Sequence, residues 1–266
     1  PHRMTRVPKV TSPAVSVNAF VLRKLRAKEN NLEFAHIVKS FDEDLAQINQ
    51  MVMEMGGIVE QSIEDAAVSL VHRDLAKAAQ VIASDKLVDS IEEQLEEKLV
   101  RVLALRQPQA QDLRLVVAVF KVAADLERIG DYAKNLAKRV QIFAEIQPNT
   151  SNSERTIKRM CLLVQKMLKD VLDAYIGKDA ALAEDVWMRD EQVDQMHDGL
   201  FRELLTYMME DPRNITPCMH LLFIAKNVER MGDHTTSIAE QVIFLVTGAK
   251  PTEKRPKSNT TLSQEV

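Results

Sequence analysis

A five-residue segment occurs twice in this chain, and the spacing of its two copies sets the size of the folding unit. Glu127-Arg128-Ile129-Gly130-Asp131 returns 102 residues later as Glu229-Arg230-Met231-Gly232-Asp233, with one apolar exchange. A period near 100 residues is too long for a solenoid repeat, which spans about 20 to 50 residues. The chain is therefore predicted to be a duplicated domain.

Both copies lie in long stretches with helical periodicity. Between residues 45 and 70, apolar residues recur at alternating steps of three and four, which is typical of the buried face of a bundled helix. The seven glycines and 5% aromatic residues among 266 also favour helices over sheet. We predict an all-α fold of two tandem three-helix bundles. The expected helices start near Phe41, follow Asp74 to Leu105, cover 109–146, cover 153–176 with Gly177 as C-cap, follow Asp179 to Met209, and run from an N-cap at Thr216 to Gly248.

The domain boundaries follow from composition. Residues 1–35 form a basic segment that we expect to be flexible, and part of it to be an expression-vector remnant, because the chain opens with Pro. Residues 36–147 are the first predicted repeat and residues 152–248 the second. A polar linker joins them, and residues 249–266 are predicted to be a flexible tail.

Charge is distributed unevenly along the chain. The net charge is −4, but residues 1–30 carry +6 and residues 249–266 carry +2, which leaves −12 for residues 31–248. An acidic helical body disfavours nucleic-acid binding and favours cations. No apolar run approaches the ~20 residues of a membrane span, and no signal-peptide core is present, so a cytoplasmic protein is predicted.

Each repeat carries two pairs of acids one helical turn apart, so the members of each pair share a helix face. Such carboxylates repel one another unless a cation neutralises them, and their oxygens suit Mg²⁺, Ca²⁺, Mn²⁺ and iron. The alternative is a solvated face on which Arg128 and Arg230 pair with the acids. The acids are Asp85, Asp89, Glu127 and Asp131 in the first repeat, and Asp190, Asp194, Glu229 and Asp233 in the second.

Gly130 and Gly232 stand in the middle of predicted helices, where each glycine costs about 1 kcal/mol relative to Ala. A solvated face gives no reason for this cost in two places. Close approach of another helix or of a ligand does give a reason. From the residues alone, a cation site, a polar-partner site and a solvated face all stay open.

The alternative function is a metal-carboxylate enzyme, such as a di-iron oxidase. Glu33 and His36 have the Glu-x-x-His spacing of di-iron bundles, but the motif occurs once, whereas such bundles use two. The chain contains no P-loop, no nucleophile elbow, no dinucleotide fingerprint and no paired metal cysteines. We therefore expect no catalytic residues and no organic cofactor.

Three segments together resemble the PhoU family, bacterial regulators of phosphate signalling that are linked to the Pst phosphate transporter. They are residues 104–114 (Ala-Leu-Arg-Gln-Pro-Gln-Ala-Gln-Asp-Leu-Arg), 125–131 (Asp-Leu-Glu-Arg-Ile-Gly-Asp) and 227–234 (Asn-Val-Glu-Arg-Met-Gly-Asp-His). The resemblance covers roughly residues 36–248. It implies two tandem three-helix bundles in a protein that often forms a homodimer.

In this family the Glu/Asp-x-x-x-Asp motifs bind metal, reported variously as iron, zinc, magnesium or manganese. The resemblance also implies that one of the two sites here carries less charge and holds metal more weakly, because Asn227 stands where the first repeat has Asp125. The implied metal ligands are Glu127, Asp131, Glu229, Asp233, Asp85, Asp89, Asp190 and Asp194.

The resemblance implies a function as well. It points to a cytoplasmic negative regulator of the phosphate regulon that also modulates Pst transport, without enzymatic activity. The expected partners are the ATPase subunit of the transporter and the sensor histidine kinase of the regulon, so the protein would meet the membrane only through these complexes.

Overall fold

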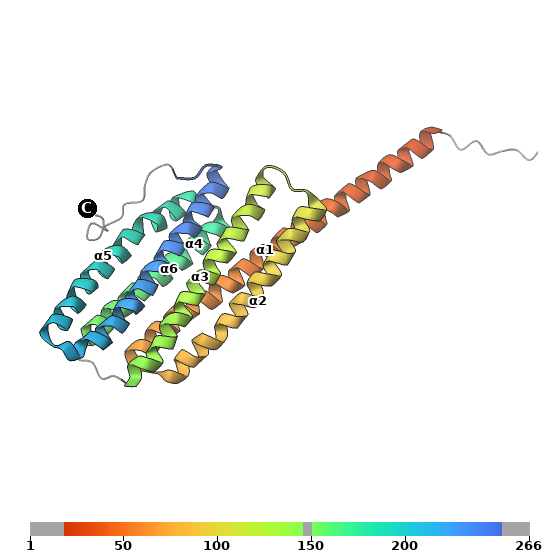
Figure 1. Cartoon of the computed structure of the whole chain (residues 1–266). Coiled ribbons are helices and arrows are strands. Elements are labelled where there is room, and N and C mark those ends of the chain that lie inside the picture. Colours follow the sequence, from red (N-terminus) through yellow and green to blue (C-terminus); the bar gives the residue numbers. More distant parts are fainter. Residues whose placement is uncertain (1–18, 146–150, 252–266) are drawn as a thin grey trace, which may run out of the picture. The chain divides into compact units, whose positions relative to one another are not determined.

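The computed structural model describes the backbone of residues 19–145 and 151–251, and the side chains of residues 40–143 and 152–251. Within these ranges the chain forms six α-helices, one short 3-10 helix and no strand, so the all-α prediction is confirmed (Figure 1). The first three helices are α1 (Ala19–His72), α2 (Leu75–Arg106) and α3 (Gln111–Glu145). The others are α4 (Ser151–Gly177), α5 (Ala180–Glu210), η1 (Pro212–Asn214) and α6 (Ile215–Thr247).

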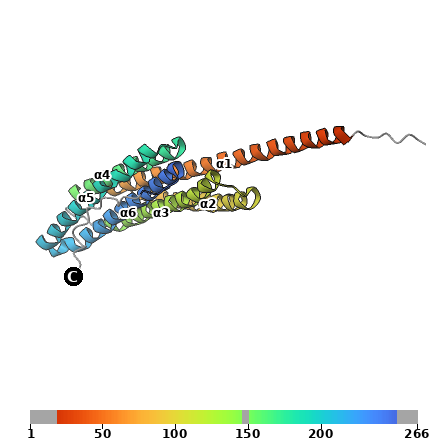
Figure 2. The same cartoon turned by 90° about the horizontal axis from the view of Figure 1, so that it is seen from above.

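From Leu45 onward the helices pack in two layers. In one layer, α2, α3, α6 and α5 lie side by side in that order, and the other layer holds α1 and α4 (Figures 1 and 2). The predicted apolar seam of α1 is confirmed, because its residues from Ile48 to Leu70 are buried. Burial of such a face, rather than local propensity, supplies most of the stability of helices in a bundle.

The two repeats begin their second helices in the same way. Asp74 and Asp179 are the predicted N-caps of α2 and α5, and each side chain accepts a hydrogen bond from the backbone N–H three residues later. An N-cap of this kind contributes about 1 kcal/mol by satisfying an N–H that has no partner inside the helix. Gly248, with φ of 79°, ends α6 as predicted.

Three predicted helix ends differ from the structure. Helix α1 begins at Ala19 instead of near Phe41, and no Pro or Gly separates the two residues. Helix α4 continues through Gly177, and Lys178 takes the left-handed conformation with φ of 51°. Thr216 does not cap α6, because η1 leads directly into that helix and places Thr216 inside its first turn.

The first repeat is three residues longer between its acid pairs, and the sequence suggested a longer loop around Pro108. The structure instead places these residues in the helices. Helix α2 has 32 residues against 31 in α5, and α3 has 35 against 33 in α6. Residues 107–110 and 211–214 are connections of equal length.

The third helices of the two repeats, α3 and α6, are antiparallel. Asp125 of α3 contacts His234 of α6, whereas Arg139, later in α3, contacts His220, earlier in α6. Tyr132 and His234 occupy corresponding positions of the two repeats, and their ring centroids lie 5.7 Å apart. Corresponding residues touch each other only where a two-fold axis passes, so a pseudo-two-fold axis relates the repeats at this point.

Candidate functional site: two carboxylate clusters

The first carboxylate cluster (Asp85, Asp89, Glu127 and Asp131) lies between α2 and α3. Its centre is Asp85, which is buried on α2 and faces Gly130 of α3. A Cβ placed on Gly130 would lie 3.9 Å from Asp85 Oδ1, at ordinary contact distance. An alanine would fit at this position, so the packing of α2 against α3 does not require Gly130, in contrast to the expectation from the sequence.

A lysine lies inside the first cluster. The Lys134 ammonium donates to Asp85 Oδ2 at 2.5 Å and also pairs with Asp131. Burial lowers the pKa of Lys134, but its hydrogen bonds to the two carboxylates outweigh this effect and raise the pKa above its usual range. The ammonium is thus a resident cation for the cluster. Arg128 is looser, with Nε 3.6 Å from Glu127 Oε2.

The negative charges of the remaining acids in this region are not fully balanced by nearby positive charges, and their pKa values are raised. Burial, followed by repulsion from Asp85, raises the pKa of Asp89, and burial with repulsion from Asp131 raises that of Glu127. Glu92, one turn beyond Asp89 on α2, is also affected. Burial and the nearby Glu127 raise its pKa to about 7. Sequence reasoning missed Glu92, although its spacing from Asp85 and Asp89 places it on the same helix face.

We expect Glu92→Gln to reduce the loss of stability at high pH. The pKa of Glu92 in the folded state lies above its ordinary value, because burial and nearby acids disfavour the charged form. The folded protein is therefore more stable while Glu92 is protonated, and this stability is lost as the pH rises through about 7. Thermal unfolding between about pH 5 and pH 8 should show a smaller decrease of Tm in the variant than in the wild type. Glu93→Gln, an exposed neighbour, is the matched control. Equal pH profiles for wild type and Glu92→Gln would contradict this account.

The second carboxylate cluster (Asp190, Asp194, Glu229 and Asp233) lies between α5 and α6 and is more deeply buried. The structure buries Asp190, Asp194 and Glu229 and leaves Asp233 half-buried. A Cβ on Gly232 would lie only 2.6 Å from Asp190 Oδ1, so the glycine is required for this carboxylate to rest against α6. The Lys226 ammonium pairs with Glu229 at 2.7 Å from the rim.

The two clusters differ in the positions of their ammonium groups, because the counterpart of Lys134 is a threonine and the counterpart of Lys226 is Ala124. Thr236 of α6 corresponds to Lys134 of α3, so the second cluster has a hydroxyl where the first has an ammonium. The Thr236 hydroxyl donates to the backbone oxygen of Asp233 at 2.7 Å. Four acids at corresponding positions therefore face different local charges in the two repeats.

Asp125 and His234 join the repeats rather than complete a cluster. His234 Nδ1 lies 2.8 Å from Asp125 Oδ1, and Arg230 donates to the Tyr132 hydroxyl instead of pairing with the acids. The resemblance attributed a charge difference between the sites to Asn227. Because its counterpart Asp125 contacts His234, the charge difference within the clusters lies at Lys134, which corresponds to Thr236, and at Lys226, which corresponds to Ala124.

As the side chains stand, no three His, Cys, Asp or Glu residues among those described are arranged to hold a metal ion. The first cluster does not fit a metal, because Lys134 already occupies the space between Asp85 and Asp131. The second cluster has suitable donor atoms for a metal ion, because it contains four carboxylates where Asp190 rests against Gly232.

The other residues considered as metal ligands or reactive groups lie elsewhere. Glu33 and His36 lie outside the described side chains. Cys161 and Cys218 are buried, and burial raises the pKa of both thiols.

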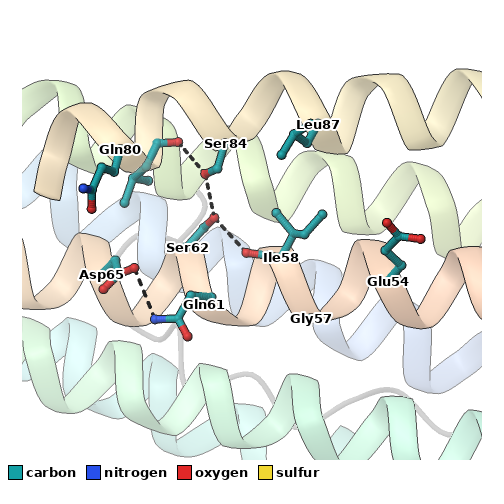
Figure 3. A pocket seen from close by; sticks show the side chains of 10 residues that line it. Glu54, Gly57, Ile58, Gln61, Ser62, Asp65, Gln80, Ser84 and Leu87 are labelled. Atoms are coloured by element: carbon teal, nitrogen blue, oxygen red, sulfur yellow. Dashed lines mark hydrogen bonds between the residues drawn. The ribbon is translucent and has the colours of Figure 1, made fainter.

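A cleft of about 430 Å³ lies on another part of the molecule, between α1 and α2 (Figure 3). The Ser62 and Ser84 hydroxyls, 3.3 Å apart, bridge the two helices at its floor, and Gln61 donates to Asp65 at 3.2 Å. Gly57 lines the cleft and has no atom within 4 Å of a Cβ position. Among the described residues, its lining contains no nucleophile paired with a base.

Known proteins resemble this chain along most of its length. The PhoU domain family model matches residues 52–140 and 157–242, once in each repeat. The chain is 50% identical over 222 residues to a phosphate-specific transport system accessory protein PhoU homolog of Caulobacter vibrioides, covering 84% of this chain and 96% of that one. A homolog of the same name from Rhizobium meliloti is 46% identical over 230 residues, covering 86% and 97%.

Solved structures agree with the sequence comparison. The crystal structure of PhoU from Pseudomonas aeruginosa has a TM-score of 0.74 at 40% identity and covers 79% of this chain and 100% of its own. The phosphate transport system regulatory protein PhoU from Streptococcus pneumoniae has a TM-score of 0.72 at 29% identity, with coverage of 79% and 99%. None of the described helices is long and apolar enough to cross a membrane. The matches in both repeats and the shared fold establish that the chain belongs to the PhoU family.

Proposed function

We propose that this protein is a cytoplasmic, non-enzymatic adaptor that modulates phosphate-specific transport and restrains the phosphate regulon. Its partners would be the ATPase subunit of the transporter and the sensor histidine kinase of the regulon. The observation that carries the proposal is identity of 50% over both repeats with a relative named as an accessory protein of phosphate-specific transport. The absence of a paired nucleophile and base in the described cleft and clusters favours a contact role over an enzymatic one.

Depleting the gene in its own organism tests the regulatory proposal. We expect phosphate-starvation genes to be expressed in high phosphate, because the restraint on the kinase would be lost. A phosphate-starvation reporter measures this response, and a plasmid copy of the wild-type gene should reverse it. Unchanged low expression after depletion would refute the proposal.

A metal ion belongs to the proposal for the second repeat. The ion would be Mg²⁺, Mn²⁺ or iron, because carboxylate oxygens are suitable ligands for these ions. Zinc sites usually include Cys or His, and the acids of the second cluster are all carboxylates. Asp190 and Asp194 from α5 and Glu229 and Asp233 from α6 would hold the ion, completed by water or a partner's oxygen. The resemblance assigned sites to both repeats, and we now assign the stronger one to the second.

Titration calorimetry with Mn²⁺ separates the two clusters. We expect the wild type to bind, an Asp190→Asn/Asp194→Asn variant to lose binding, and a Glu127→Gln/Asp131→Asn variant to retain most of it. Equal loss in both variants would contradict the assignment to the second repeat. If no heat of binding is measured up to about 1 mM Mn²⁺, the proposed site for this ion is refuted.

We also propose that the protein forms a homodimer. Light scattering of the purified chain tests this proposal.

A further inference from the structure

The cleft between α1 and α2 continues along both helices. A second hollow of about 300 Å³ shares Glu54, Ile58 and Leu87 with the cleft of about 430 Å³. Together they form what we call the α1–α2 groove, which runs along α1 from Met51 to Asp65. Fourteen helical residues span about 21 Å, so the groove is as long as about four turns of another helix.

The α1–α2 groove is negatively charged. Its lining includes two carboxylates, Glu54 and Asp65, on either side of the bridge between Ser62 and Ser84, and no Lys or Arg among the described residues (Figure 3). Asp65 is balanced by Lys77, which donates to its Oδ1 at 2.5 Å. Glu54 is exposed, and among the described residues it forms no ion pair. A cationic group that enters the groove would therefore meet an acid that is accessible and unbalanced.

The two repeats can be compared residue by residue at this place. Residues of α1 and α2 correspond to residues 105 positions later in α4 and α5. Arg73 and Lys178, which take the left-handed conformation between these helices, are 105 residues apart and confirm this register. The groove between α1 and α2 therefore has a direct counterpart between α4 and α5.

Arg189 bridges α4 and α5 where the first repeat has the groove. It stands at the position of Ser84, and its guanidinium donates to Asp170, with Nη2 2.6 Å from Oδ2. Asp170 is the counterpart of Asp65, which lines the groove. The Arg189 side chain is 16% exposed, so its stem is largely covered by the two helices. The second repeat thus shows which group fits between helices of this kind: a guanidinium on an apolar stem.

Smaller side chains leave the same space open in the first repeat. Gly57 and Ser62 of α1 stand where α4 has Leu162 and Met167. A Cβ on Gly57 would have no described atom of the chain within 4 Å, so packing inside the chain gives no reason for this glycine. Glycine in the interior of a helix lowers helix stability, and close approach of another backbone is a reason to keep it. The groove is therefore shaped for a partner from outside the described chain.

We propose that the α1–α2 groove is the docking site for a basic helix of the transporter ATPase subunit, with one arginine beside Asp65, in the place that Arg189 fills in the second repeat. Gly57 would let the backbone of this helix approach, and Glu54 would pair with a second cation. The body of this chain, residues 31–248, carries a net charge of −12, so charge complementarity favours a basic helix of another protein over a second copy. The inference rests on the proposed function, which supplies the ATPase subunit as a partner.

Binding of the full chain to the purified ATPase subunit of the same transporter tests the groove. Gly57→Leu and Ser84→Arg introduce the side-chain types that occupy the corresponding space of the second repeat, and each should weaken binding at least about tenfold. The matched control is Gly199→Leu, at an exposed glycine of α5 that also has no described atom within 4 Å of a Cβ position. It should change affinity less than about threefold.

A second pair of variants tests the charge of the groove. Glu54→Gln should weaken binding at least about threefold and make the affinity less sensitive to salt, because the accessible carboxylate is removed. Glu93→Gln, at an exposed acid of α2 outside the groove lining, should leave both the affinity and its salt dependence unchanged.

Circular dichroism and thermal unfolding verify that the variants are folded. Ser84→Arg removes the hydroxyl that lies 3.3 Å from the Ser62 hydroxyl. Gly57→Leu keeps this contact, so it tests the groove even if Ser84→Arg does not fold.

The outcomes separate this inference from the proposed function. If the wild type does not bind the ATPase subunit, the proposed function fails and this docking site with it. If the wild type binds, and Gly57→Leu binds no worse than Gly199→Leu, only the docking site is refuted. A groove variant that changes the oligomeric state of the chain without changing ATPase binding would identify a second copy as the occupant, and would also refute the inference.

Discussion

Lys134→Met is expected to lower the free energy of unfolding by about 2 to 3 kcal/mol, because it leaves Asp85 without its cation. The Asp85 side chain is 7% exposed and the Lys134 side chain 19%, so water cannot easily replace the ammonium. Removal of one member of a buried ion pair generally destabilises a protein more than the pair stabilised it. Urea denaturation of both proteins at pH 7 measures the difference.

Two further variants keep this prediction falsifiable. The double variant Lys134→Met/Asp85→Asn removes the stranded charge and should regain much of the lost stability. Lys77→Met removes the lysine from the more exposed pair with Asp65, and should produce a much smaller change. Mn²⁺ should stabilise Lys134→Met more than the wild type, since the first cluster then lacks its resident cation. A single variant as stable as the wild type would show that Lys134 does not balance the buried charge.

Gly232→Ala is expected to destabilise the protein by about 1 to 2 kcal/mol, whereas Gly130→Ala stabilises it by up to about 1 kcal/mol. Both substitutions gain helix propensity. The new methyl group on residue 232 would lie 2.6 Å from Asp190 Oδ1, which must move inside a buried site. At residue 130 the nearest atom would be Val88 Cγ1 at 3.6 Å, an ordinary contact.

Thermal and urea unfolding of the two glycine variants measure this contrast directly, because the residues occupy corresponding positions of the two repeats. Gly57→Ala is a useful reference for propensity alone, since a Cβ there has no neighbour within 4 Å. Equal effects of Gly130→Ala and Gly232→Ala would mean that Asp190 adjusts without cost. The close approach of this carboxylate to α6 would then contribute nothing to stability.

Most of the fold could be predicted from local sequence signals. The steps of three and four around Val52 and Ile63 identify a buried helix face, and Asp74 and Asp179 identify helix starts, because these effects act within one or two turns. The ends of α4 and α6 could not be predicted in this way. The left-handed conformation that ends α4 is adopted by Lys178, although the neighbouring Gly177 would adopt it at lower cost. At the start of α6, η1 leads into the helix in place of the N-cap expected at Thr216.

The candidate site was only partly predictable for a different reason. Residues that share a face within one helix follow from spacing, so the acid pairs could be foreseen. The close approach expected at both glycines is confirmed at Gly232 and is not required at Gly130. Contacts between helices depend on how each helix is rotated about its axis. The pairing of Lys134 with Asp85, 49 residues away, and of His234 with Asp125, 109 residues away, is of this kind. Nothing in the sequence distinguished these partners from other charged residues nearby.

The contact between Tyr132 and His234 on the pseudo-two-fold axis has a consequence for the origin of the chain. An interface in which corresponding residues meet across a two-fold axis is the isologous interface of a symmetric dimer. The seam between α3 and α6 therefore has the geometry of a symmetric dimer of two single-repeat chains, in which the third helix of each packs antiparallel to that of the other. Fusion into one chain made the halves independent in sequence, and this freedom is what allowed lysine to persist in one cluster while threonine occupies the same place in the other.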